Sequence, residues 1–172
     1  MRTGFSLLEL VVVIALLGLS LLLVVPQFSQ QMEKEQLKTA VSDVQAFILQ
    51  ARSLAITHHQ NLWLHLIFPS SSATNNGVSP GWQLWVSTAE DRSKGQRLLT
   101  LSGQRYRKIL VRSGFPQNRL FIDGHSGKLG NGSITFSARN TPERQIKVIT
   151  SYGAGRVRHC SVGTAIYGYP AC

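Results

Sequence analysis

The chain has 172 residues, with 18 lysines and arginines against 8 aspartates and glutamates, and a formal net charge of +10. Hydrophobic residues make up 43% of the chain and charged residues 15%, which excludes an intrinsically disordered protein because such chains are poor in apolar residues. Two cysteines are too few for a disulfide-dense small protein or a zinc site with four thiolates. The strongly basic balance indicates a polyanionic partner, either nucleic acid or an anionic surface.

The excess of positive charge lies in the later part of the chain. In residues 1–52 four basic groups are balanced by four acidic ones, whereas from Arg92 onward 14 basic groups face only Asp123 and Glu143. Ten of these 14 groups are arginines, whose planar side chain suits bidentate contact with phosphate.

Residues 5–25 form an apolar run that four residues interrupt, Glu9 among them. As a helix this run is roughly 31 Å long, about the thickness of the hydrocarbon core of a bilayer. A secretory signal peptide is one alternative, but the run is too long and no small-residue cleavage site follows it. A plain membrane anchor is the other, and Glu9 argues against it because an unpaired carboxylate in lipid costs several kcal/mol.

The N-terminal residues Met1-Arg2-Thr3-Gly4, followed by Phe5-Ser6-Leu7-Leu8-Glu9-Leu10 and the apolar run, resemble the class III signal of type IV pilins and pseudopilins. The resemblance implies that a prepilin peptidase cleaves after Gly4 and that Phe5 is N-methylated. It also implies a single-pass subunit of the inner membrane, with a periplasmic C-terminal domain, that joins other type IV pilin subunits in a pilus filament. Pro26 then falls at the position where pilin helices commonly carry a proline.

After cleavage the positive amino group of Phe5 lies a few residues from the Glu9 carboxylate. Both charges are costly in lipid, and each lowers the cost of the other when the helices of adjacent subunits stagger. Glu9 is therefore predicted to set the axial register during assembly, as a single polar group sets register in a coiled coil.

Beyond Pro26 the apolar residues recur at spacings of three, four and seven, which is typical of an amphipathic helix on a core. The stripe consists of Leu37, Val41, Val44, Ile48, Ala51 and Ala55. We expect one helix over about residues 5–57, kinked or loosened near Pro26.

From Asn61 the period changes from 3.6 to 2, which indicates strands. A strand is expected from Leu62 to Phe68, then a loop over 70–81, then further strands over 82–88, 98–102, 108–113, 119–123, 133–137 and 144–150. The predicted fold class is α+β, a pseudopilin fold with a long helix packed on an antiparallel β-sheet domain. Its parts are a leader (1–4), a transmembrane and filament-core helix (5–25), an amphipathic continuation (26–57) and a periplasmic β-rich domain (58–172).

Within the pseudopilins the layout resembles the FimT/GspH group. Ile122-Asp123-Gly124 with Asn131-Gly132-Ser133-Ile134-Thr135-Phe136 is similar to that group's paired glycine turns, and Gly155-Arg156-Val157-Arg158 is similar to the Gly-Arg-x-Arg motif of its FimT branch. One departure is that residues 136–142 lack the glycine expected after the strand. The FimT resemblance implies capture of extracellular DNA during natural transformation.

The residues of the basic end favour the same function. Arg156 and Arg158 point the same way in an extended segment and lie roughly 6.6 Å apart, close to the spacing of phosphates along one DNA strand. A second predicted cluster consists of Arg105, Arg107, Lys108 and Arg112. Nothing indicates a base-reading helix, so duplex DNA is expected to bind through its phosphates without regard to sequence. The alternative is a purely structural subunit, either a minor pseudopilin of a type II secretion system or a pilus-priming subunit.

Cys160 and Cys172 lie beyond the last expected strand. In the periplasm they can form a disulfide that closes a loop of about 13 residues and stabilises the domain by about 3 kcal/mol. A metal site is the alternative, but it lacks further thiolates. His58, His59 and His65 have no recognised ligand spacing, and we predict no cofactor, no metal and no catalytic activity.

We predict that Glu9→Ala leaves cleavage after Gly4 intact but blocks incorporation into the filament, because the variant lacks the charge that fixes the helix register. The measurement is a pull-down with other pilin subunits, with N-terminal sequencing as the control for cleavage. Normal incorporation of the variant would contradict the prediction.

Overall fold

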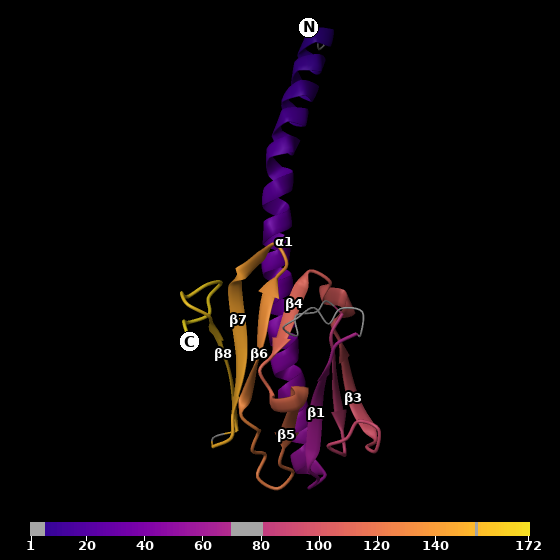
Figure 1. The fold of residues 1–172 in the computed structure, drawn as a ribbon. Helices are drawn as coiled ribbons and strands as arrows, with labels where there is room; N and C mark the ends of the chain where they lie inside the picture. The colour runs from indigo at the N-terminus through magenta and orange to yellow at the C-terminus, as the bar shows by residue number, and fades with distance from the viewer. Residues whose placement is uncertain (1–5, 70–80, 154) are drawn as a thin grey trace.

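The computed structural model describes residues 6–69, 81–153 and 155–172, and of residues 21–30 it describes only the backbone. Gly4 and Phe5, the predicted processing site, lie outside the described residues, as does almost all of the predicted loop over 70–81. Figure 1 shows a long N-terminal helix whose first half projects from the β domain and whose second half packs against it.

The helix α1 (Leu7–Thr57) has 51 residues and continues through Pro26 without interruption, so the prediction of one helix is confirmed. Its two halves differ in burial as their sequences predict. Leu7 is 80% exposed, whereas the apolar stripe from Leu37 to Ala55 is buried in the core. The second half of the helix is thus held by tertiary packing, which supplies most of the stability of an amphipathic helix.

Among the described residues, no helix carries an apolar stretch long enough to cross a membrane. The predicted membrane segment, residues 5–25, is described only in part. Phe5 lies outside the described residues, and of residues 21–25 only the backbone is described.

In the described part of the chain, eight strands form two antiparallel sheets of four strands each. The first sheet has the order β3-β2-β1-β5 and consists of β1 (Leu62–Ile67), β2 (Gln83–Ser87), β3 (Arg97–Ser102) and β5 (Arg119–Ile122). The second sheet has the order β4-β6-β7-β8 and consists of β4 (Ile109–Ser113), β6 (Gly132–Ala138), β7 (Thr141–Ser151) and β8 (Arg156–Ser161). The α+β class and the seven expected strands are confirmed.

The last strand, β8, is absent from the sequence prediction, which ended the strands at residue 150. Its residues alternate between exposed arginines and partly buried side chains, and the strand pairs with β7 along its whole length. The turn between β6 and β7 is the other difference. Arg139 and Asn140 join the paired residues Ala138 and Thr141, so this hairpin has a two-residue connection without the expected glycine.

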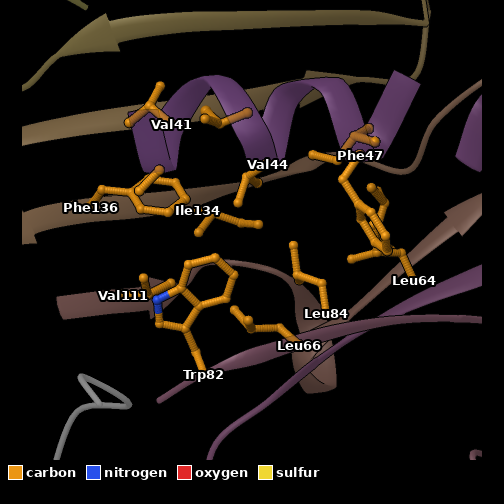
Figure 2. Packing of buried hydrophobic residues seen from close by; sticks show 14 of the residues in the cluster. Val41, Val44, Phe47, Leu64, Leu66, Trp82, Leu84, Val111, Ile134 and Phe136 are labelled. Atoms are coloured by element: carbon orange, nitrogen blue, oxygen red, sulfur yellow. The ribbon is translucent and has the colours of Figure 1, made fainter. Parts of the chain in front are cut away.

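The core lies where the inner faces of both sheets meet the buried stripe of α1. Figure 2 shows Val41, Val44 and Phe47 of the helix facing side chains from both sheets. Trp82 is fully buried, with its ring stacked on Tyr106 at 6.1 Å between centroids and edge-on to Phe136 at 6.2 Å. The helix and both sheets therefore share a single core.

The histidines divide between core and surface. His65 is buried, and its Nε2 lies 2.9 Å from the hydroxyl of Ser87. Burial lowers the pKa of His65, so the ring is neutral at pH 7. His58 and His59 are exposed after the end of α1. In the described part of the chain, no three His, Cys, Asp or Glu side chains are grouped so that they could hold a metal ion.

We predict that Phe136→Ala lowers the free energy of unfolding by about 3–5 kcal/mol, because it leaves a cavity in the shared core. The neighbouring Ser137 lies on the opposite face of β6 and is half-buried, so Ser137→Ala should change that free energy by no more than about 0.5 kcal/mol. Chemical unfolding of both variants measures the difference. Equal destabilisation would contradict the placement of the core.

Candidate nucleic-acid interface

The outer face of the second sheet carries positive charge from three strands. Directly opposed residues of an antiparallel pair lie on the same face of a sheet. Because Lys147 is opposite Cys160 and Thr135, and Thr135 is opposite Arg112, these residues form one row across the sheet. Arg156 and Arg158 alternate with the inward residues of β8 and lie on the same face as Cys160. We call Arg112, Lys147, Arg156 and Arg158 the cationic face.

The four charges follow a diagonal path. Arg156 and Arg158 are two residues apart in β8, which places them about 6.6 Å apart along the strand. Arg158 is the diagonal neighbour of Lys147, at roughly 7–8 Å. Arg112 is on β4 and Lys147 on β7, with β6 between them, so their backbone positions are roughly 9.6 Å apart across the sheet. The path has steps that a flexible phosphate backbone can follow.

In the part of the chain that the structure describes, the cationic face has no ion-pair partner. None of its four charged groups lies within 4.0 Å of a described carboxylate oxygen, and the acidic residue of β7, Glu143, lies four residues along the strand from Lys147. The three arginines are exposed and Lys147 is half-buried. The residues around the cationic face are mostly small and polar, such as Ser133 and Thr135, so a large polyanion can approach this surface closely.

The structure divides the second predicted cluster. Arg112 belongs to the cationic face, but Arg105 lies 4.0 Å from Asp43 and Lys108 lies 3.7 Å from Glu33, both on α1. Arg107 is exposed at the end of the short helix Gly103–Tyr106. The four residues therefore form no single surface, and two of them already have acidic partners.

Gly155, the first residue of the Gly-Arg-x-Arg segment, has a structural role. Its φ of +55° is unfavourable for any residue with a Cβ, and a Cβ would lie 3.0 Å from the carbonyl oxygen of Gly127 and 3.1 Å from Arg52 Nη2. The guanidinium of Arg52 is packed into this junction, with its Nε buried and without a hydrogen-bond partner. The glycine thus lets the chain turn tightly from β7 into β8 over the end of α1.

The C-terminal tail returns along the other end of β8. A disulfide joins Cys160 to Cys172, with the two Cα atoms 5.0 Å apart. The backbone N–H of Ser161 donates to Pro170, and that of Cys172 donates to Ser161. The predicted disulfide is therefore present, and it fixes the tail beside the strand that carries Arg156 and Arg158.

The aromatic residues near the C-terminus have protein partners, and for Tyr152 the partner is Lys128, whose Nζ lies 5.3 Å from the ring centroid. The ring of His159 lies edge-on to Tyr169 at 4.9 Å, and its Nδ1 is 3.0 Å from the Gln45 side chain on α1. The hydroxyl of Tyr167 accepts a hydrogen bond from Arg144. Tyr152 is 47% exposed, in the loop that precedes β8. Of these aromatic side chains, Tyr152 is the most accessible to a ligand of the cationic face.

Glu9, the predicted assembly residue, lies in the first turn of α1 and is exposed. It is far along the helix from the β domain, so it shares no surface with the cationic face (Figure 1). The predicted assembly residue and the cationic face thus lie on separate parts of the molecule.

Lys147 is the residue of the cationic face that the sequence prediction did not single out. The alternation of Ile146 and Val148 with Lys147 in the expected strand already placed its side chain on the outer face. Its proximity to Arg158 and Arg112 depends on the strand order, which local patterns do not reveal.

Three comparisons relate the chain to known proteins. A family model of type II transport protein GspH matches residues 40–153. Two crystal structures of the type IV minor pilin FimU from Pseudomonas aeruginosa strain PAO1 are similar in fold, with TM-scores of 0.55 and 0.52 at 15% and 14% identity. The alignments cover 78% and 76% of this chain and 98% and 100% of the FimU chains. No curated protein sequence matches the chain.

We predict that Gly155→Ala lowers the free energy of unfolding by about 1–2 kcal/mol, because alanine is strained at this positive φ. Gly153→Ala is the matched control, since a Cβ there meets nothing within 4 Å. Thermal unfolding of the two variants makes the comparison. A Gly155→Ala variant as stable as Gly153→Ala would show that the turn into β8 does not require glycine.

Proposed function

The chain belongs to the family of type II transport protein GspH and is a minor pilin or pseudopilin, and we propose that this subunit binds DNA without regard to sequence through its cationic face. The family is one of structural pilin and pseudopilin subunits, which implies that the chain contacts other pilin subunits. The proposal adds a ligand to that structural role.

The observation that carries the proposal is the set of four cations on one face of the second sheet, none of which forms an ion pair with a described residue. Each cation that meets a phosphate releases a counterion condensed on the DNA, and this release supplies essentially all of non-specific affinity. The face belongs to a sheet rather than a helix, and its side chains are spaced for a backbone rather than for base edges. Such an arrangement suits phosphate contact.

The proposed subunit is processed after Gly4 by a prepilin peptidase, is methylated at Phe5, and is held in the inner membrane until Glu9 guides it into a filament. The β domain is then in the periplasm and, after assembly, on the filament surface. A DNA-binding surface on this domain suits the uptake of DNA in natural transformation. In Figure 1, β8 lies at the edge of the β domain, away from the projecting half of α1, which supports separate sites for DNA binding and for assembly.

A second candidate function is favoured by the family model itself, whose description is of a type II transport protein. In that case the chain is a structural pseudopilin of a type II secretion system, and it binds no DNA. A titration of the protein with labelled duplex DNA decides between the two candidates.

We predict that duplex DNA binds the protein with an affinity that falls steeply with salt, and that Arg156→Ala with Arg158→Ala removes most of this binding. Losing two phosphate contacts should also reduce the slope of log affinity against log salt by about 2. The measurement is a titration of labelled duplex at two ionic strengths.

The matched control is Arg92→Ala with Arg139→Ala, which removes the same charge from two exposed positions outside the cationic face. An equal loss of affinity in both double variants would indicate a diffuse charge effect. Unchanged gel shifts for the Arg156 and Arg158 variant would refute the assignment of this face.

A further inference from the structure

The outer face of the first sheet contains an aromatic cavity of about 400 Å³. Trp63 and Phe121 line it, and their rings meet edge to face with centroids 5.4 Å apart. Trp63 of β1 is directly opposite Phe121 of β5, so the sheet register holds both rings on the same face. Both side chains are half-buried and accessible in part. We call this space the aromatic cavity.

Polar groups lie around the aromatic rings, and Arg119 among them is held in place. Arg119 lines the cavity and is fixed by Glu90, with Nη2 3.2 Å from the carboxylate and Nη1 donating to the backbone carbonyl at 3.2 Å. Gln117 and Asn131 line it as well. Amide, guanidinium and carboxylate groups therefore surround a flat apolar surface.

The segment that brings Gln117 to the cavity has an unusual backbone. Gln117 and the following Asn118 both have positive φ values, +52° and +56°. This conformation is unfavourable for Gln117, whereas asparagine adopts it more readily. The side chain of Gln117 is thus presented to the cavity from a strained turn.

The aromatic cavity is connected to the cationic face through Asn131. The side-chain oxygen of Asn131 accepts a hydrogen bond of 2.7 Å from the backbone N–H of Tyr152, and the preceding residue, Ser151, is paired with Arg156. The loop from β5 to β6 and the loop from β7 to β8 lie at the same end of the domain, opposite the N-terminus (Figure 1). A DNA strand whose phosphates contact Arg158 and then Arg156 therefore runs toward the aromatic cavity.

We propose that the aromatic cavity binds one unpaired base of a DNA strand whose phosphates contact the cationic face. This inference rests on the proposed function and adds a preference to it. Aromatic side chains stack on any base, and amide and guanidinium groups can hydrogen-bond to exposed base edges. Bases in an intact duplex are stacked inside the helix and cannot enter, so duplex DNA uses only the cationic face. Single strands and frayed ends use both.

The experiment uses the full chain in a non-ionic detergent, because the exposed apolar side chains of α1 favour aggregation. The two probes are a short oligothymidylate and an abasic oligonucleotide of the same length, which has the same phosphates but no bases. We expect oligothymidylate to bind about tenfold more tightly than the abasic strand and to quench tryptophan fluorescence. Equal affinities without quenching would overturn the proposal.

Variants locate the effect. Trp63→Phe should remove most of the quenching and largely keep the affinity, whereas Trp85→Phe, on the neighbouring strand β2, should keep both. The fully buried Trp82 gives a constant background in each case. Phe121→Leu retains apolar volume and should weaken oligothymidylate binding about tenfold without changing abasic binding. Quenching that persists in Trp63→Phe would overturn the assignment.

A separate arm distinguishes this proposal from that for the cationic face. Arg156→Ala with Arg158→Ala should weaken binding of both oligonucleotides and leave quenching at saturation unchanged. A short tyrosine-containing peptide is the last probe, because an aromatic cavity could also receive a protein side chain. Quenching by the peptide and not by oligothymidylate would overturn the proposal in favour of a protein partner.

Discussion

The structure depends on the burial of one stripe of α1 beneath two sheets at once. The apolar side chains from Leu37 to Ala55 contact strands of both sheets, so a single helix fixes the orientation of each. This packing buries much of the inner faces and leaves the two outer faces free to differ in chemistry. The first sheet presents Trp63 and Phe121, and the second presents the cationic face. One shared core thus supports two distinct surfaces.

The charges of the β domain follow the same division. Where cations lie near α1 they meet carboxylates, as Lys108 meets Glu33 and Arg105 meets Asp43. The hydroxyl of Tyr106 also donates to Asp43, and the Asn140 side chain donates to Glu33. The acidic groups of the helix therefore balance positive charge close to it, whereas the far side of the second sheet is unbalanced. Part of the positive charge of the chain thus lies where an anionic ligand can approach.

Periodicity predicted the helix and seven strands because each of these elements has a face that must be buried. The same reasoning missed β8, since its short run of arginines follows a glycine and has few apolar residues. Strand order, and with it the place of Lys147, depends on pairing between distant segments. The aromatic cavity was missed for a related reason, because Trp63 and Phe121 meet only through the β1–β5 ladder.

Strand β8 is the edge strand of the second sheet, and its arginines also affect pairing at this edge. The C-terminal tail covers the strand near Ser161, but along Arg156–Cys160 no other described strand pairs with its free side. Open edges of this kind invite pairing with a second chain, and charged side chains oppose it. Arg156 and Arg158 therefore also keep neighbouring copies apart, and a molecule that lost both would gain a route to self-association through its backbone.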